Sequence, residues 1–229
     1  MAVYACADLH GRYDLYEKIK EFVKPEDKIY FLGDANDRGP DGWKLIKAIY
    51  EDPQFVYIMG NHEDMLLDAM AYFIDSNFRI DSKLHDYLTE TESYPTFEKW
   101  AAEPNKEHWF VKIGSLPLHE IYNSEETGNC FCLTHAGFTP GKKNKEDDFL
   151  LWDREHMKDK WPINYDKLYV VHGHTPISLM RGPELNSDCF YTGSYWYCCN
   201  HKVNLDVGAA WSGFTVLLNL DTLEDFIIG

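Results

Sequence analysis

The first 75 residues alternate between short apolar runs and longer stretches in which apolar positions recur every three or four residues. The runs Val3–Ala7, Ile29–Leu32 and Phe55–Met59 have the length of buried strands. The stretches that follow them have helical spacing, and their apolar stripes are Leu15, Ile19, Phe22 and Val23; Trp43, Ile46, Ile49 and Tyr50; and Met65, Leu66, Ala69, Met70 and Phe73. This alternation of strand and helix predicts an α/β fold.

The pattern changes over residues 76–128, which are rich in charged and aromatic residues and are interrupted by Pro95, Pro104 and Pro117. We expect helices and loops there, forming a lid or rim. Short apolar runs dominate the rest of the chain, and the predicted elements are strands at Cys130–Thr134, Leu168–Val171, Phe190–Tyr197, Val203–Asp206 and Phe214–Leu220 and a helix at Trp152–Trp161. The mixture predicts a sandwich of two sheets flanked by helices. No linker divides the sequence, so we expect residues 1–229 to form one domain with an insertion around 76–128.

Polar residues gather where the predicted strands end. Five clusters stand out, which are Asp8-Leu9-His10-Gly11, Gly33-Asp34-Ala35-Asn36-Asp37-Arg38-Gly39, Gly60-Asn61-His62-Glu63, His135-Ala136-Gly137 and His172-Gly173-His174-Thr175. One such aspartate is usually a helix cap and one such histidine is usually a packed core residue, but five clusters in one chain are hard to explain in that way. Ligands of α/β folds bind at the carboxyl ends of strands, and Asp, His and Asn side chains bind divalent ions. The clusters therefore predict a metal site.

The charge balance narrows the range of partners. The chain of 229 residues has 22 Lys and Arg against 38 Asp and Glu, which gives a formal net charge of −16. A general nucleic-acid binder needs a basic patch, and none is visible, so no nucleic acid is expected as a partner. No apolar run approaches the ~20 residues of a membrane-spanning helix, and the N-terminus lacks the features of a secretory signal. We expect a cytoplasmic protein with no membrane partner.

The order of the motifs, DxHG, GDxxDRG, GNHE, HAG and GHT, resembles the phosphoprotein phosphatase branch of the calcineurin-like metallophosphoesterases. The compact bacterial and phage-type serine/threonine phosphatases are the most similar. The motifs run from Asp8 to Thr175, and the segment Leu205–Ala209 resembles a late strand of that family. The resemblance implies the calcineurin-like fold, in which a two-sheet β-sandwich is flanked by helices. It also implies two divalent metal ions as cofactors, with Mn²⁺ expected and Fe, Zn, Ni or Co as alternatives.

The resemblance also assigns the metal ligands. Asp8 and His10 would bind the first ion, and Asp34 would bridge both ions. The ligands of the second ion would be Asn61, His135 and His174. A carboxylate suits the bridging position because it has two oxygens and a full charge.

The catalytic roles come from the same resemblance. His62 would be the general acid and would pair with Asp37. Arg38 and Arg154 would contact the phosphate, and Asn61 would contact substrate as well as metal. The chemistry is consistent with these roles, since a water held between two cations readily becomes hydroxide and the leaving alkoxide needs a proton. A positioned acid typically contributes ~10²–10⁴-fold in rate.

Together these features predict a metal-dependent phosphoprotein phosphatase. It would hydrolyse phosphomonoesters, above all phosphoserine and phosphothreonine in proteins, by direct attack of a metal-bridging hydroxide. Its partners would be a phosphorylated protein or peptide, or a small phosphate ester.

Two alternatives remain open. The resembled phosphatases often carry an arginine two residues before the motif asparagine, where this chain has Met59. Symmetrical diadenosine tetraphosphatases often have an apolar residue there, so a dinucleoside polyphosphate hydrolase is the first alternative. The second is a non-catalytic metal-binding interaction module, although no predicted ligand or acid is missing. The role of His172 is also open between a ligand and a packed or hydrogen-bonded residue.

Overall fold

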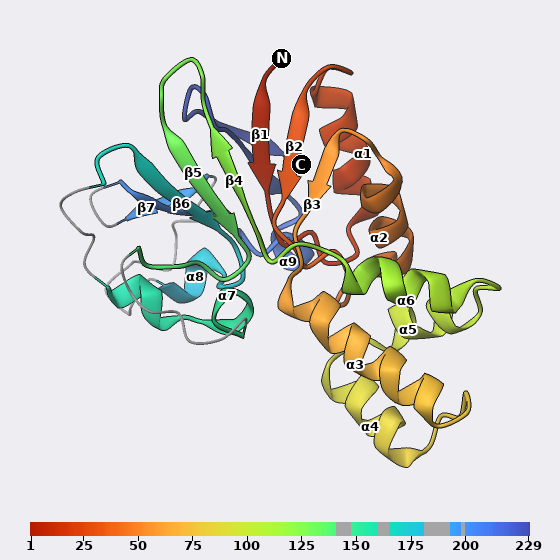
Figure 1. The fold of residues 1–229 in the computed structure, drawn as a ribbon. Helices are drawn as coiled ribbons and strands as arrows, with labels where there is room; N and C mark the ends of the chain where they lie inside the picture. The colour runs from red at the N-terminus through yellow and green to blue at the C-terminus, as the bar shows by residue number, and fades with distance from the viewer. Residues whose placement is uncertain (141–147, 160–164, 181–192, 198–199) are drawn as a thin grey trace.

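The computed structural model describes residues 1–140, 148–159, 165–180, 193–197 and 200–229. Two five-stranded sheets face each other, and helices cover the outer side of the first sheet (Figure 1). Apolar side chains from both sheets meet between them, for example Ala5 and Leu218 from the first sheet and Phe131 and Val203 from the second. The predicted α/β sandwich is therefore confirmed.

The first sheet has the order β10-β9-β1-β2-β3. Strands β1 (Val3–Cys6), β2 (Lys28–Phe31) and β3 (Phe55–Tyr57) are parallel, whereas β9 (Thr215–Asn219) and β10 (Asp225–Ile228) are antiparallel neighbours. Helices α1 (Tyr13–Phe22) and α2 (Gly42–Glu51) connect the parallel strands, and α3 (Asn61–Asp75) follows β3. The strands and helices expected in this part of the chain are present. The carboxyl ends of β1, β2 and β3 lie at one edge, where three of the polar clusters begin.

The second sheet has the order β4-β5-β6-β8-β7. Its strands are β4 (His119–Asn123), β5 (Cys130–Thr134), β6 (Leu168–His172), β7 (Tyr195–Tyr197) and β8 (Lys202–Asn204). Strand β4 is a correction, because helices and loops were expected up to residue 128. It is an edge strand that pairs only with β5 among the described strands, so exposed and half-buried side chains alternate along it, and it contains no continuous apolar run. Of the strand expected over Phe190–Tyr197, residues 190–192 lie outside the described ranges.

The helix expected over Trp152–Trp161 is wrong. Helix α7 (Asp148–Trp152) ends where that helix would begin, and a short 3₁₀ helix spans Glu155–Lys158. The side chain of Asp153 explains the break, because its carboxylate accepts hydrogen bonds from the backbone N–H groups of Glu155 at 3.0 Å and His156 at 2.9 Å. Residues 160 and 161 lie outside the described ranges.

Helices α4 (Ser82–Glu90), α5 (Tyr94–Ala101) and α6 (Lys106–Gly114) occupy most of the segment expected to be a lid or rim. They extend with α3 to one side of the sheets (Figure 1). Buried residues of these helices, such as Leu88, Phe97 and Trp109, belong to the same apolar core as the helix-covered side of the first sheet. Two short helices, α8 (Ile177–Met180) and α9 (Ala209–Ser212), follow strands β6 and β8.

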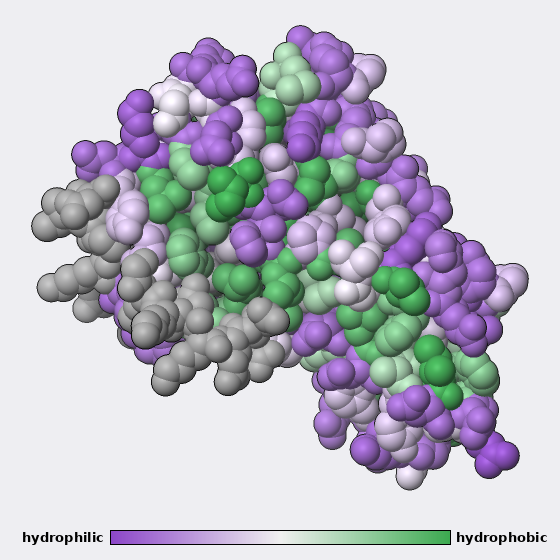
Figure 2. All heavy atoms as spheres, viewed as in Figure 1, coloured by the Kyte–Doolittle hydropathy of each residue, from purple (hydrophilic) through white to green (hydrophobic). Residues whose placement is uncertain are grey.

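Hydrophilic and hydrophobic residues are unevenly distributed over the surface. Hydrophilic residues cover most of the rim of the face shown in Figure 2, and hydrophobic residues gather toward its middle. Within the described ranges, no helix has the length and apolar character needed to cross a membrane.

Candidate metal centre

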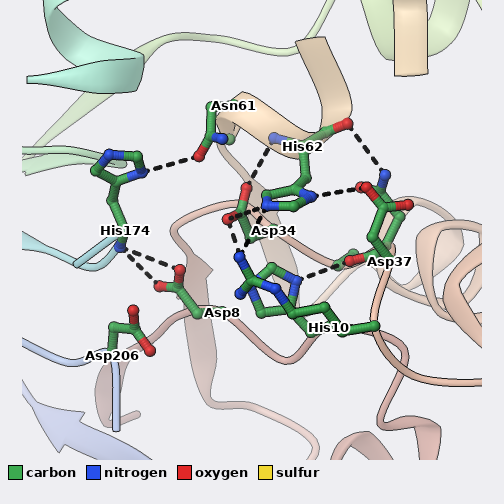
Figure 3. Close-up of polar contacts among 12 residues, drawn as sticks. Asp8, His10, Asp34, Asp37, Asn61, His62, His174 and Asp206 are labelled. Carbon is green, nitrogen blue, oxygen red and sulfur yellow. Dashed lines mark hydrogen bonds and ion pairs between the residues drawn. The ribbon is translucent and has the colours of Figure 1, made fainter. Parts of the chain in front are cut away.

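The polar clusters converge at the edge where the strands end, and their side chains point toward one another (Figure 3). Six of these residues have left-handed backbones, with φ between 43° and 67°; they are Asp8, His10, Asp34, Asp37, Arg38 and His174. This conformation is uncommon for residues other than glycine and is concentrated at functional sites, where the surrounding structure holds it in place. The site is therefore built at a cost in local backbone energy.

Close contacts between the loops hold this backbone. Gly33 has a φ of 89°, and a Cβ atom at that position would lie 2.5 Å from Gly60 Cα. At Gly173, a Cβ atom would lie 1.9 Å from the Asp8 carboxylate. Any larger side chain at either glycine would push the loops apart, so these glycines allow Asp8 and Asp34 to reach the centre.

Asp34 is shared by two groups of potential ligands. One group is His10, Asp34 and His62, and the other is Asp8, Asp34 and His135; within each group the ligand atoms lie within 4.8 Å of one another. Asp34 Oδ2 lies 3.6 Å from His10 Nε2, and Asp34 Oδ1 lies 3.4 Å from His135 Nε2. Each carboxylate oxygen thus faces a different group, as a bridging ligand requires. Asp8 and His10 fall into different groups, so their sharing of one ion stays a prediction.

Asn61 connects the remaining ligands. Its Oδ1 atom lies 2.8 Å from His135 Nε2 and 2.9 Å from His174 Nδ1. The backbone N–H of His174 donates to both oxygens of Asp8 at 3.1 Å. All six predicted metal ligands are buried and lie in one continuous network, although their separation by up to 166 residues gives no hint of it.

The tautomers of two histidines suit metal binding. Nδ1 of His10 lies 2.8 Å from the carbonyl oxygen of Asn36, and Nδ1 of His135 lies 2.7 Å from that of Leu32. A carbonyl only accepts, so each Nδ1 carries the hydrogen and each Nε2 presents its lone pair toward Asp34. Burial lowers the pKa of His10 to about 3, because it disfavours the charged imidazolium. This imidazole is therefore neutral near pH 7, as a ligand must be.

The carboxylates explain why cations fit here. Burial, followed by the neighbouring charges of Asp206 and Asp34, raises the pKa of Asp8. Burial is also the largest cause that raises the pKa of Asp206 to about 7. Asp206 Oδ2 has no hydrogen-bond partner among the described residues. Buried carboxylates that repel one another, together with neutral imidazoles and an amide oxygen, form a donor set that fits two divalent cations.

His62 differs from the metal-ligand histidines. Burial alone would lower the pKa of His62, but Asp34 and Asp37 outweigh it and the pKa is raised. His62 Nδ1 lies 2.7 Å from Asp37 Oδ2, and His62 Nε2 lies 3.1 Å from a guanidinium nitrogen of Arg38. The second terminal guanidinium nitrogen of Arg38 contacts His10. The pairing expected between His62 and Asp37 is therefore present, and Nε2 is the atom of His62 that faces the centre.

The structure also places Arg154, Met59 and His172, the remaining residues considered in the sequence. Arg154 Nε lies 3.4 Å from His174 Nε2, so both predicted phosphate-binding arginines reach histidines of the centre. Met59 is buried in the apolar core beside α3. His172 is fully buried, its ring lies 4.7 Å from that of His156, and its Nδ1 lies 3.0 Å from the carbonyl oxygen of Gly173. The packed, hydrogen-bonded alternative for His172 is the one that the structure has.

Glu63 has a structural role that its sequence position did not reveal. It is fully buried, and its carboxylate accepts hydrogen bonds from the backbone N–H groups of Asp34, Ala35 and Gly60 at 2.7–2.8 Å. The hydroxyl of Tyr57 donates a fourth at 2.8 Å. Glu63 therefore locks the loop that carries Asp34 to the loop that carries Asn61. Its place in the GNHE motif was the available signal, but a glutamate in the first turn of a helix is also favoured by the helix dipole.

Comparison with known proteins places the chain in a family. The model of the calcineurin-like phosphoesterase family matches residues 1–198, and the chain belongs to this family. The match does not separate the phosphoprotein phosphatase branch from the others.

Individual relatives are distant. The asymmetrical bis(5'-nucleosyl)-tetraphosphatase PrpE of Bacillus thuringiensis is 22% identical, and the alignment covers 95% of this chain and 89% of the relative. A solved structure described as a putative diadenosine tetraphosphatase has a TM-score of 0.67 at 14% identity, covering 99% of this chain and 92% of the other. A cold-active protein-tyrosine phosphatase of Shewanella sp. has a TM-score of 0.52 at 15% identity, covering 99% and 80%. At these identities the solved structures support the fold alone.

Proposed function

We propose that the chain is a hydrolase that uses two divalent metal ions to cleave a phosphate ester or anhydride. The observation that supports it best is the juxtaposition of the His62–Asp37 pair with two ligand groups that share Asp34. A non-catalytic metal site needs the ligands but has no use for a paired acid beside them. We expect Mn²⁺ to support activity, with Fe, Zn, Ni or Co as alternatives, and we propose a cytoplasmic location.

The two cations, when bound, supply a hydroxide nucleophile and neutralise charge on the phosphoryl oxygens. Asp8, His10, Asp34, Asn61, His135 and His174 would hold them. Arg38 and Arg154 would bind oxygens of the phosphate, for which the planar guanidinium is suited. As the bond from phosphorus to the leaving oxygen breaks, His62 Nε2 would give its proton to that oxygen. Asp37 holds the Nδ1–H of His62 and so keeps Nε2 directed at the centre.

Two substrate classes fit this chemistry. The first is a phosphomonoester, above all phosphoserine or phosphothreonine in a protein, as the motifs predict. The second is a dinucleoside polyphosphate. It is favoured by the names of the sequence relatives and by Met59, whose burial means that position 59 supplies no phosphate contact.

A substrate panel tests the proposal. The purified protein would be assayed with Mn²⁺ between pH 6 and 9 against phosphoserine and phosphothreonine peptides, a phosphotyrosine peptide, 4-nitrophenyl phosphate and diadenosine tetraphosphate. Hydrolysis that requires added metal is expected. Two bound metals by elemental analysis, with no substrate cleaved, would contradict the proposal and favour the non-catalytic module.

A further inference from the structure

A cavity of about 420 Å³ opens beside Arg38. Its lining residues are Arg38, Gly39, Glu92, Pro95 and Trp211. The volume lies within the range of ordinary small-molecule sites. Trp211 is 67% exposed, although it is the largest apolar residue of the lining. Trp211 thus presents an aromatic ring to the cavity beside Arg38, the arginine that we propose binds phosphate.

The backbone that carries Trp211 is firmly held. Its N–H donates to the carbonyl oxygen of Gly208 at 2.9 Å, and the N–H of Gly208 donates to Asp206 Oδ1 at 2.9 Å. Arg12 donates to the carbonyl oxygen of Ala209 at 3.0 Å. A Cβ atom at Gly208, whose φ is 70°, would lie 3.1 Å from the indole ring, so the ring packs against this glycine. The aromatic surface is placed before any ligand arrives, which lowers the entropy cost of binding.

The ring is also next to the reaction centre. The guanidinium carbon of Arg38 lies 5.1 Å from the centre of the Trp211 ring, and the same guanidinium group is 3.1 Å from His62 Nε2. A phosphate on Arg38 therefore has an aromatic surface within reach of the group attached to it. A flat aromatic group is the natural occupant of such a surface, because it buries the indole and gains stacking energy.

Glu92 indicates which flat group this is. Glu92 lines the same cavity, and an ionised carboxylate only accepts hydrogen bonds. Nucleobases carry ring or exocyclic N–H donors, whereas the ring of a phosphorylated tyrosine has none. We propose that Trp211 and Glu92 form a binding site for the base of a nucleotide substrate, whose phosphate chain extends over Arg38 to the metal centre. The proposal rests on the proposed function and selects its second substrate class.

The test compares Trp211→Ala and Trp211→Phe with the wild-type protein. The KM for diadenosine tetraphosphate is expected to rise about 5- to 150-fold in Trp211→Ala, the range that loss of base–aromatic stacking gives. Trp211→Phe keeps an aromatic face and should recover most of this loss. A phosphoserine peptide serves as the substrate without a base, so the ratio of the two KM values is the readout. Ile227→Ala, which removes an exposed apolar side chain from β10, is the matched control and should change neither KM.

A binding measurement needs no turnover. Adenosine 5'-monophosphate is expected to quench the tryptophan fluorescence of the wild-type protein without added metal, and Trp211→Phe should lose that quenching while keeping the circular dichroism spectrum of the folded protein. Equal losses toward the dinucleotide and the phosphoserine peptide, or a loss confined to a phosphotyrosine peptide, would overturn the base site. If the wild-type protein cleaves nothing, the proposed function fails, and the quenching experiment still decides whether the base site exists.

Discussion

The hydroxyl of Ser93 donates a hydrogen bond to Asp37 Oδ2 at 2.9 Å, and the same oxygen faces His62 Nδ1 at 2.7 Å. Ser93 is fully buried and lies between α4 and α5, in the segment that the sequence marks as an insertion. The helices of this segment therefore help to hold the pair that we assign to proton donation. That segment was expected to be a lid or rim, and a covering role for it stays a prediction.

Ser93→Ala should slow the cleavage of substrates with poor leaving groups. Without the hydroxyl, Asp37 loses one hydrogen bond to a charged group, and His62 is held less firmly. We expect kcat for a phosphoserine peptide to fall up to about tenfold. The kcat for 4-nitrophenyl phosphate, whose leaving group needs little protonation, should change much less.

The comparison of leaving groups separates this role from a loss of folding, because misfolded protein would lower both rates equally. Ser115→Ala is the matched control, since the hydroxyl of this exposed serine bonds only to the Lys112 carbonyl oxygen among the described contacts. Equal effects of Ser93→Ala on both substrates would refute the positioning role.

Substitutions of His62 and Asp34 should distinguish a residue that donates a proton from a residue that binds metal. His62→Asn removes the proton donor, so turnover of a poor leaving group should fall about 10²–10⁴-fold while bound metal stays near two ions per chain. Asp34→Asn removes charge from the shared ligand and should lower both turnover and metal content. Elemental analysis of the purified variants measures the second quantity. Metal loss of the same size in both variants is the outcome that contradicts these assignments.

The two histidines of the HGHT segment should behave differently. His174 contacts Asn61 and faces the centre, so His174→Ala should lower metal content severely. His172 is buried and packs on His156, and His172→Ala should mainly lower the melting temperature because it leaves a gap in a buried region. Metal analysis and thermal unfolding of each variant provide the check. A severe loss of metal from His172→Ala would show that its role is not packing alone.

Glu63→Gln should destabilise the protein although the two side chains have nearly the same shape. The Glu63 carboxylate is the acceptor in all four of its hydrogen bonds. The amide N–H₂ group of glutamine would therefore face donors and leave buried groups unpaired. The free energy of unfolding should fall by about 1–3 kcal/mol for each unpaired donor. Denaturant unfolding measures it, with Glu21→Gln on the exposed side of α1 as the control. An unchanged free energy of unfolding relative to that control would show that the hydrogen bonds of Glu63 between the two loops do not contribute to stability.

Local sequence was sufficient to predict those helices and strands in which a pattern of apolar residues extends over several positions. The parallel strands follow from short continuous apolar runs, because both of their faces pack against apolar cores, and α1, α2 and α3 follow from helical periodicity, because each buries one side. The candidate ligand residues could also be named, since each sits in a motif at the end of a strand. Strand β4 could not, because an edge strand with alternating exposure lacks an apolar run. The segment after Trp152 could not either, because the Asp153 side chain competes with the helix for backbone N–H groups.

The sequence by itself determined which groups could bind metal, because that property belongs to the side chains, and the resemblance of its motifs to a known family singled out His62 as the acid. Only the tertiary structure decided that each oxygen of Asp34 faces a different ligand group and that Glu63 joins two loops. It also decided that Ser93 supports Asp37 and that Trp211 lies against Arg38. Apart from the local contact between Gly60 and Glu63, these relations join residues between 24 and 173 positions apart, and the distance between such residues is set by the packing of the sheets and helices rather than by local sequence.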